Sequence, residues 1–376
     1  MSLRQIIEQE IRERGPIPFS RYMQLCLYHP ELGYYSRHAE QFGKAGDFYT
    51  SSDVHAVFGR LLARQFEEMW RALGSPQQVS IVELGPGRGL FAQDVLDWSA
   101  KKFLEFAYAL RYCLIENSPA LHRELKSRFS QLIERRKVQV CYDVDEMQSY
   151  LDHTIVFANE YFDAFPVEVV SDAGQVFVDV RDGKFEEVCL PPTPAVQAYL
   201  DQYSVRPEPG ERVEAPLAAQ QAVAGLARLM RSGFVVLIDY GYSRAELLAG
   251  RHRGTVMAYR QHSASPNPYQ APGEQDITAH VNFTALAAVA EQEGLLPQPL
   301  LTQSQFLMGI GEPNQFADAF EDCRLPQEHA KVALQLKHLV TPAGMGESFH
   351  VFVASKGVSA EKVAALSGLS FSKSRL

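Results

Sequence analysis

The sequence predicts an α/β fold in which helices cover both faces of a parallel sheet. Five short, almost continuous apolar runs alternate with helical segments, and such runs are typical of strands buried on both faces. They span residues 79–84, 111–115, 138–142, 154–158 and 234–238. Two further strands are expected at 297–303 and 349–355. With 376 residues, 46% of them hydrophobic, the chain can bury one large core with insertions, or two modest ones.

The N-terminal part reads as helices and loops. A first helix carries Ile6, Ile7 and Ile11 on one side and stops at Gly15-Pro16. A long loop rich in glycine and tyrosine follows at 29–52, and such loops are usually functional. A further helix, with apolar residues at helical spacing, then extends to about Trp70.

Two stretches interrupt the alternation of strands and helices. Residues 166–232 contain a hairpin-like piece, with strands at 167–170 and 176–180 and a turn at Asp182-Gly183, and then a proline-rich link. Residues 240–282 are rich in loops. After residue 356 we expect one short helix and then a flexible tail.

Composition excludes several classes of protein. The chain has 36 basic and 45 acidic residues, a net charge of −9, which disfavours nucleic acid as a partner. Five scattered cysteines and eleven scattered histidines lack ligand spacing, so neither a disulfide framework nor a metal site is predicted. No apolar run reaches the roughly 18 residues of a membrane span, and the first residues resemble neither a signal nor a transit peptide. We therefore expect a soluble, cytoplasmic protein of unknown oligomeric state.

A glycine loop follows the first predicted strand. A dinucleotide fingerprint would need glycine where the chain has Leu90, and the Gly-Lys-Ser/Thr of a P-loop is absent. What remains is an acid two residues before three alternating glycines, which is typical of methyltransferases that use S-adenosyl-L-methionine (SAM). Glycines at such a turn let backbone amides approach a ligand. The predicted cofactor-binding residues here are Glu83, Gly85, Pro86, Gly87 and Gly89.

Polar side chains also follow the next three strands. Glu116 is placed to accept both ribose hydroxyls of a nucleoside. After the third strand, Asp143 is expected to accept from the adenine amino group while Val144 packs on the ring. Asn159 and Glu160 follow the fourth strand, at the carboxyl edge where open α/β sheets bind ligands. Together with the glycine loop, these positions predict a SAM pocket.

Several segments resemble the MidA family of SAM-dependent methyltransferases. They are GDFYT at 46–50, VELGPGRG at 82–89, ENSP at 116–119, NEYFDAFPV at 159–167, DYGY at 239–242, PGEQDIT at 272–278 and HVNF at 280–283. The resemblance implies the Rossmann-like class I fold and SAM as cofactor. The family includes the mitochondrial complex I assembly factor that acts on an arginine of a complex I subunit. The resemblance therefore implies a protein substrate, with a respiratory complex subunit as a candidate, and the chain looks like a bacterial member.

The chain departs from the family pattern in a few places. Ser52 and His55 stand where Pro and Ser are usual, and Phe165 stands where Leu is usual. Asn282 replaces the usual Asp, which removes any role for an acid there.

The resemblance and the pattern of elements together suggest a division of the chain. Residues 1–77 are expected to form a helical and loop region that covers the active site. Residues 78–355 are expected to form the class I methyltransferase domain, interrupted by the β-containing insertion 166–232. Residues 356–376 would be the flexible tail.

Methyl transfer to arginine needs carboxylates, because a guanidinium is always charged. We predict Glu160 and Asp163 as the pair that holds it, with Asn159 beside them. In the long N-terminal loop, Asp47 and Thr50 are predicted to clamp the cofactor, with Asp47 accepting from the amino group of SAM.

Other interpretations stay open from sequence. Glu160 and Asp163 would also suit the first turn of a helix. Amino methylation of a nucleic-acid base would favour Asn-Pro-Pro-Tyr/Phe, and the segment from Asn159 to Phe162 lacks those prolines. A methyltransferase for small molecules remains open, as does a SAM-binding assembly factor with little catalysis.

Overall fold

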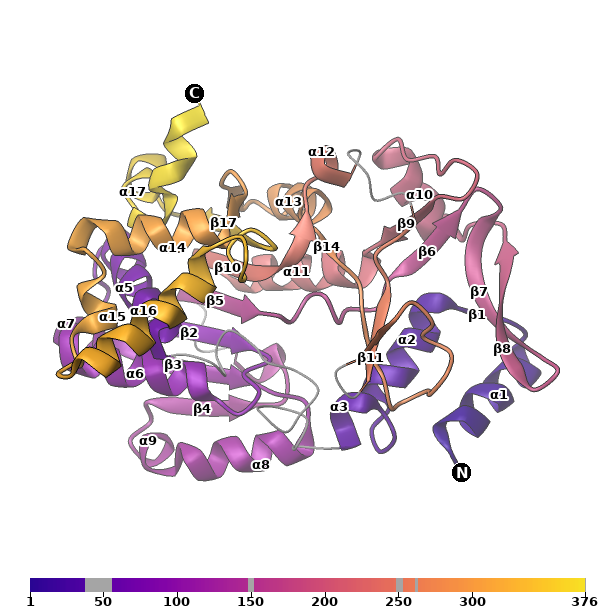
Figure 1. The fold of residues 1–376 in the computed structure, drawn as a ribbon, viewed down its shortest axis with the longest axis horizontal. Coiled ribbons are helices and arrows are strands. Elements are labelled where there is room, and N and C mark those ends of the chain that lie inside the picture. Colours follow the sequence, from indigo (N-terminus) through magenta and orange to yellow (C-terminus); the bar gives the residue numbers. More distant parts are fainter. Residues whose placement is uncertain (38–55, 148–151, 248–252, 261–262, 376) are drawn as a thin grey trace.

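The computed structural model describes residues 1–37, 56–147, 152–247, 253–260 and 263–375. Its central sheet has the strand order β15-β17-β10-β5-β2-β3-β4 (Figure 1). The strands are β2 (Val79–Leu84), β3 (Leu110–Ile115), β4 (Val138–Cys141), β5 (His153–Asn159), β10 (Ser232–Tyr242), β15 (Leu296–Pro297) and β17 (Phe349–Lys356).

The five central strands predicted from the apolar runs are confirmed, and they pair in parallel. The last strand differs from the expectation of a parallel sheet, because β17 runs antiparallel to β10. The predicted strand at 297–303 is broken into two short strands, β15 and β16 (Leu301–Thr302). Pro297 and Pro299 lack the N–H that a continuous ladder needs.

Alternate residues of the central strands face two different hydrophobic cores. Ile81, Ile155 and Val236 pack with the helices α5 (Ala56–Ala72), α6 (Leu90–Lys102) and α14 (Gln303–Gly311). Their neighbours Val82, Val156 and Val235 pack with α11 (Leu217–Leu229) and α13 (Phe283–Gln292). Most residues of β2, β3, β5 and β10 are therefore buried on one side or the other, which explains why the sequence shows nearly continuous apolar runs.

A second structural unit lies beside the carboxyl edge of the central sheet (Figure 1). Its larger sheet has the order β1-β7-β6-β9, with β8 paired to β7. These strands are β1 (Ile17–Pro18), β6 (Glu168–Ser171), β7 (Gly174–Arg181), β8 (Lys184–Leu190) and β9 (Arg212–Ala215). A smaller sheet consists of β11 (Met257–Arg260), β12 (Ser263–Ser265) and β13 (Asp276–Thr278).

Residues from distant parts of the sequence share the core of this second unit. The helices α1 (Leu3–Arg14) and α2 (Phe19–Tyr28) bury Ile7 and Met23 against Val178 of β7 and Ile277 of β13. A capping box of Ser2 and Gln5 starts α1. Residues 166–215 thus fold together with the N-terminal helices and with segments from 256–279.

The expected division of the chain needs correction at two places. Residues 1–77 are not one region, since α1 and α2 belong to the second unit while α5 packs in the core of the central sheet. The insertion does not extend to 232 as a separate piece either, because α11 covers the central sheet. In both cases an amphipathic helix buries its apolar face on the nearest available sheet.

The remaining helices complete the two units. The α-helices are α3 (Tyr34–Arg37), α7 (Leu104–Ala109), α8 (Pro119–Arg128), α9 (Ser130–Glu134), α10 (Pro194–Gln202), α12 (Arg244–Leu247), α15 (Ala317–Phe320), α16 (Pro326–Val340) and α17 (Ala360–Ala364). The 3₁₀ helices are η2 (Val144–Met147), η3 (Glu312–Asn314) and η4 (Ser367–Arg375). A two-residue strand, β14 (Val281–Asn282), pairs with β10. In the described part of the chain, no helix is long and apolar enough to cross a membrane.

The expectation of a flexible C-terminal tail is wrong for the described residues up to Leu369. Val363, Leu366 and Leu369 are buried in the same core as α5 and α14. The side chain of Gln65 on α5 also accepts the backbone N–H of Gly368 at 2.7 Å. Apolar residues three apart bury one face of this segment, so it packs rather than frays.

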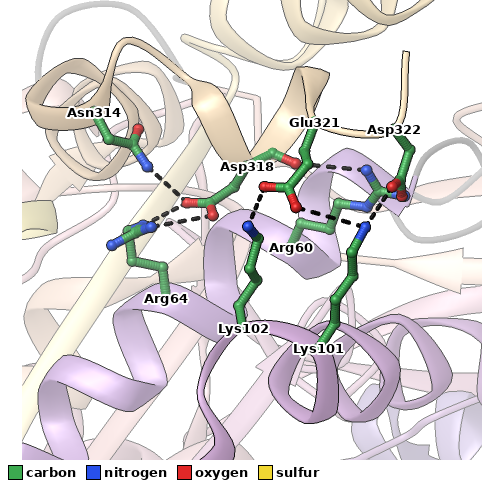
Figure 2. Close-up of polar contacts among 8 residues, drawn as sticks. All are labelled: Arg60, Arg64, Lys101, Lys102, Asn314, Asp318, Glu321 and Asp322. Carbon is green, nitrogen blue, oxygen red and sulfur yellow. Dashed lines mark hydrogen bonds and ion pairs between the residues drawn. The ribbon is translucent and has the colours of Figure 1, made fainter. Parts of the chain in front are cut away.

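An ionic cluster joins α15 to α5 and α6 (Figure 2). Asp318 is buried and accepts from both Arg64, with Nη2–Oδ1 at 3.1 Å, and the amide of Asn314 at 2.8 Å. Around it are ion pairs of Arg60 and Lys101 with Asp322, and of Lys101 and Lys102 with Glu321. This cluster holds α15 and the two residues after it against α5 and α6, at the end of the molecule away from the second unit (Figure 1).

Candidate active site

A cavity of about 520 Å³ lies between the carboxyl edge of the central sheet and the second unit. Such edges are where open α/β sheets bind ligands. The sheet contributes residues at or just after the carboxyl ends of β2, β3, β4, β5 and β10, while the second unit contributes tyrosines and one aspartate. The lining residues discussed below are Tyr28, Tyr35, Gly85, Gly87, Glu116, Tyr142, Glu160, Tyr161, Asp163, Tyr240, Tyr259, Ala264, Asp276, Ala279 and His280.

The glycine loop forms one wall of the cavity through Gly85 and Gly87. Both have left-handed backbone angles, with φ of +63° and +53°, which glycine adopts without strain. A Cβ at residue 85 would lie 2.5 Å from Cδ2 of Tyr161, so a side chain there would displace that ring. Gly89 instead packs under the loop, where a Cβ would meet Leu125 at 2.6 Å.

Glu83 and Pro86 stand behind the loop rather than in the cavity. The Glu83 carboxylate is buried in β2 and accepts the Tyr112 hydroxyl at 2.7 Å. Burial raises the pKa of Glu83 to about 8, although the hydrogen bond from Tyr112 opposes this shift. The Pro86 carbonyl accepts the N–H of Gly89 at 2.8 Å and so closes the turn. Both residues shape the loop, and direct cofactor contact by either stays a prediction.

Glu116 lies at the end of β3 and lines the cavity, as its position in the sequence suggested. Its Oε1 accepts the N–H of Ser118 at 2.8 Å, and the amides of Gly87 and Asn117 also donate to the carboxylate. These bonds tie it to the glycine loop. Burial raises the pKa of Glu116 to about 7 despite the donors.

The structure does not bring the pair after β4 into the cavity. The Asp143 side chain is exposed and accepts the N–H of Asp145 at 2.8 Å, which starts a 3₁₀ turn, and Val144 packs half-buried against the core. Tyr142 lines the cavity instead, with its ring stacked on His122 at 3.8 Å between centroids. The sequence alone gives no reason to choose Tyr142 over the neighbouring Asp143 as the residue that lines the cavity.

The loop after β5 carries the predicted catalytic residues. Glu160 lines the cavity with a left-handed φ of +51°, and its N–H donates to the Ile238 carbonyl at 3.0 Å. The Asn159 amide donates to Oε1 of Glu160 at 3.1 Å, so Asn159 contacts the neighbouring carboxylate while lying outside the lining. A non-glycine residue in this conformation costs free energy, and such residues cluster at functional sites.

Asp239, in the carboxyl-terminal half of β10, organises this loop and was missed from the sequence. Its Oδ2 accepts the backbone N–H groups of Tyr161, Phe162 and Asp163 at 3.1, 2.8 and 3.2 Å. It is buried, and desolvation together with the charge of Glu160 raises the pKa of Asp239 to about 7. This role depends on the pairing of β10 with β5, two strands that are adjacent in the sheet but far apart in the sequence.

Asp163 lines the cavity and is only 8% exposed. Burial raises the pKa of Asp163 well above its usual range, and the charges of Asp239, Asp276 and Glu160 raise it further. The first-turn interpretation of Glu160 and Asp163 is not observed, because no helix begins at this loop among the described residues. Both acids face the same cavity.

The cavity is acidic and aromatic. Four of its lining residues are carboxylic acids: Glu116, Glu160, Asp163 and Asp276. Among the lining residues that the structure describes, His280 alone can carry a positive charge. Six tyrosines complete the wall: Tyr28, Tyr35, Tyr142, Tyr161, Tyr240 and Tyr259. Such a site suits ligands that bring their own positive charge.

Asp47 and Thr50 lie outside the described residues. Their proposed role as a clamp over the cofactor stays a prediction.

Comparison with known proteins identifies the family. The family model for "Putative S-adenosyl-L-methionine-dependent methyltransferase" matches residues 61–299. The chain belongs to this family. It is 30% identical to the protein arginine methyltransferase NDUFAF7 homolog, mitochondrial, of Drosophila melanogaster, over 96% of this chain and 86% of that protein. It is 26% identical to the human protein arginine methyltransferase NDUFAF7, mitochondrial, over 91% and 81% of the two chains.

A solved structure shows the same fold with a product ligand. A COG1565 superfamily member from Burkholderia thailandensis, crystallised with S-adenosyl-homocysteine, superimposes with a TM-score of 0.84 at 28% identity, covering 98% of this chain and 94% of that one. A native crystal structure of a COG1565 protein from the same organism gives a TM-score of 0.80 at 28% identity, covering 97% and 93%. The class I fold predicted from the sequence is confirmed, and this chain is a SAM-dependent methyltransferase.

The described site fits the cofactor. A Cβ at Gly85 would displace the Tyr161 ring of the cavity wall, and Glu116 offers a carboxylate beside the glycine loop. The remaining acids suit the positive sulfonium and amino groups of SAM.

The expected cytoplasmic location is contradicted, because the curated relatives are named as mitochondrial proteins.

Proposed function

We propose that this methyltransferase transfers methyl groups to arginine side chains of a protein. The observation that carries the proposal is the cavity itself, in which Glu160, Asp163 and Asp276 gather without lysine or arginine among the described lining residues. An acceptor that is always a cation matches this charge, whereas a carboxylate acceptor would be repelled. The curated relatives named as protein arginine methyltransferases support the same acceptor.

The protein would act mainly by holding and neutralising the acceptor. Bound SAM supplies an electrophilic methyl group on a positively charged sulfur. Glu160 and Asp163 would accept hydrogen bonds from the guanidinium and fix its orientation. A methylated nitrogen must lose one proton, and a carboxylate with a raised pKa, such as Asp163, is a stronger base than an ordinary one. Asp239 would keep both acids in place through the backbone of their loop.

The second unit offers a place for the polypeptide that carries the arginine. In the described residues, β8 pairs with β7 alone, so its other edge presents backbone groups to which an extended chain could add as a further strand. The acidic balance of the protein would favour a basic segment of the partner. The candidate substrate is a respiratory complex subunit, and only the family resemblance supports this choice.

Labelling tests this function. The protein is incubated with methyl-labelled SAM and a cell lysate, and labelled proteins are identified by mass spectrometry. We expect label on few proteins with the parent and none with the Glu160→Gln, Asp163→Asn double variant, which should still bind S-adenosyl-homocysteine. Full labelling by the double variant would contradict the role of the two acids. Binding of SAM with no labelled protein would favour an assembly factor with little catalysis.

A further inference from the structure

We propose that Asp276 of the second unit and Asp163 of the central-sheet unit together bind the substrate guanidinium, so that arginine is recognised across both units. This inference rests on the proposed function and names the residues that select its substrate. Asp276 belongs to the PGEQDIT segment, to which the sequence assigned no role. Its strand β13 is far from the glycine loop in sequence.

The register of the small sheet directs Asp276 into the cavity. In the antiparallel pair β11–β13, Asp276 lies opposite Tyr259, and in the pair β11–β12, Tyr259 lies opposite Ala264. Side chains directly opposite each other share one face of a sheet. All three residues line the cavity, so this face of the small sheet forms its outer wall.

Two sets of hydrogen bonds fasten this wall to the loop that carries Asp163. The N–H of Ala279, just after β13, donates to the Asp163 carbonyl at 2.9 Å. On the other side, the Tyr35 hydroxyl donates to Oδ1 of Asp276 at 2.8 Å, and the Tyr35 ring packs 5.5 Å from that of Tyr28. The Tyr28 hydroxyl in turn donates to the carbonyl of Ala164 at 3.0 Å. Asp276 is therefore held beside Asp163 from both ends.

Two buried carboxylates close to each other repel, and a bound cation relieves that repulsion. Asp163 is 8% exposed and Asp276 is 4% exposed. The charge of Asp276 contributes to the raised pKa of Asp163, so Asp163 tends to hold a proton until a cation binds beside it. The titratable groups around the pair are Glu116, Glu160, Asp239, Tyr28, Tyr35, Tyr161, Tyr240, Tyr259 and His280. Only His280 among them can be a cation.

The wall favours a guanidinium over an ammonium. A guanidinium is planar and presents five N–H donors in a fixed fork, so it can donate to two carboxylates in its plane. Its faces also stack on aromatic rings, and the rings of Tyr28, Tyr35 and Tyr259 line the same cavity as Asp276. A lysine ammonium gains less from this arrangement because it acts as a compact point charge.

Binding of blocked amino acids tests the pair without requiring turnover. N-acetyl-arginine-methylamide and N-acetyl-lysine-methylamide are titrated calorimetrically into the complex with S-adenosyl-homocysteine. The parent should bind the arginine probe more tightly than the lysine probe. Asp276→Asn should weaken arginine binding by about 10- to 100-fold, because one charge-assisted hydrogen-bonding group is lost. Glu274→Gln is the matched control, since that exposed acid pairs with Arg260 at the surface, and it should bind like the parent.

Proton release on binding distinguishes direct contact of Asp276 with the guanidinium from a merely structural role of Asp276. Titrations at pH 7 in two buffers of different ionisation enthalpy should show release of up to about one proton per arginine probe by the parent, because the cation displaces the proton of the pair. Asp276→Asn should release less. Tyr35→Phe keeps both acids but removes the donor to Asp276, and should weaken binding less than Asp276→Asn.

Three results would overturn the inference: no binding of the arginine probe to the parent at millimolar concentration, equal binding by folded Asp276→Asn, or lysine binding as tight as arginine binding. These results are distinct from failure of the proposed function. If the arginine probe binds and depends on Asp276 while labelled lysate contains no methylarginine, the proposed function fails and the binding site stands.

Discussion

The Asp239 carboxylate accepts the backbone N–H of Phe162 at 2.8 Å and thereby joins β10 to the loop after β5. The same oxygen accepts from the two flanking residues, Tyr161 and Asp163. The loop that presents Glu160 and Asp163 is thus fixed by one side chain from a neighbouring strand. Methyl transfer requires the acceptor to be aligned with the methyl group of SAM, and a rigidly held loop provides this alignment.

Replacing Asp239 should disturb the loop that carries Glu160 and Asp163 while cofactor binding changes little. Asp239→Ala leaves three N–H groups of the loop without their acceptor, two of them buried, so we expect a loss of about 2–4 kcal/mol in unfolding free energy and a fall in kcat of at least about 100-fold. Affinity for S-adenosyl-homocysteine should change much less. Asp239→Asn keeps one acceptor oxygen and should be milder. Urea unfolding and labelled methyl transfer measure both effects, and unchanged turnover in Asp239→Ala would refute this account of the loop.

The glycine loop predicts a steric effect at residue 85. In Gly85→Ala the new Cβ would lie 2.5 Å from the Tyr161 ring, which lines the cavity, so the ring must move. We expect affinity for S-adenosyl-homocysteine to fall by about 10-fold or more. Gly210→Ala is the matched control: its φ of +84° imposes a similar backbone cost of about 1–2 kcal/mol, with nothing within 4 Å of the new Cβ. Equal affinities in the two variants would contradict the prediction.

Glu83 should make stability fall as pH rises. Its pKa in the folded protein is about 8, raised by burial from an ordinary value near 4.5, so between these values the folded state binds more protons than the unfolded state. The free energy of unfolding then decreases with rising pH, by up to about 1.4 kcal/mol per unit. Glu83→Gln keeps an acceptor for Tyr112 and should flatten this slope between pH 5 and 8. Urea titrations that show identical slopes would exclude the effect.

The ionic cluster in Figure 2 should matter for stability and not for the site. Asp318→Asn weakens a buried acceptor of Arg64, so we expect a loss of about 1–3 kcal/mol in unfolding free energy with unchanged affinity for S-adenosyl-homocysteine. Asp201 pairs with Arg206 at 2.7 Å on the exposed surface, and Asp201→Asn should have no measurable effect. Similar melting temperatures for the two variants would show that burial of Asp318 is unimportant.

Features encoded by neighbouring residues could be predicted from the sequence. The run 79–84 coincides with β2, because strands buried on both faces are apolar throughout. The turn at Asp182-Gly183 between β7 and β8 has left-handed φ values of +49° and +70°, which this residue pair favours. The position of Glu116 in the cavity lining could also be predicted, because ligands bind at the carboxyl ends of strands in such a sheet.

Features that depend on distant contacts could not be predicted. Asp143 follows a strand like Glu116, yet it turns outward and starts a 3₁₀ helix. Asp276 and Tyr35 reach the cavity only because the N-terminal helices, the inserted sheet and the small sheet share one core. Asp239 acts through backbone amides on another strand, and no spacing in the sequence records that contact.

Amino-acid analysis of the labelled product tests the central claim most directly. Protein labelled with methyl-SAM by this enzyme is hydrolysed, and the labelled residue is identified by chromatography against methylated standards. The acidic cavity, with Asp163 and Asp276 among its lining residues, predicts label in methylarginine, and no label when the Glu160→Gln, Asp163→Asn double variant is used. Label in methyl-lysine, in a methyl ester, or in a small molecule would contradict it.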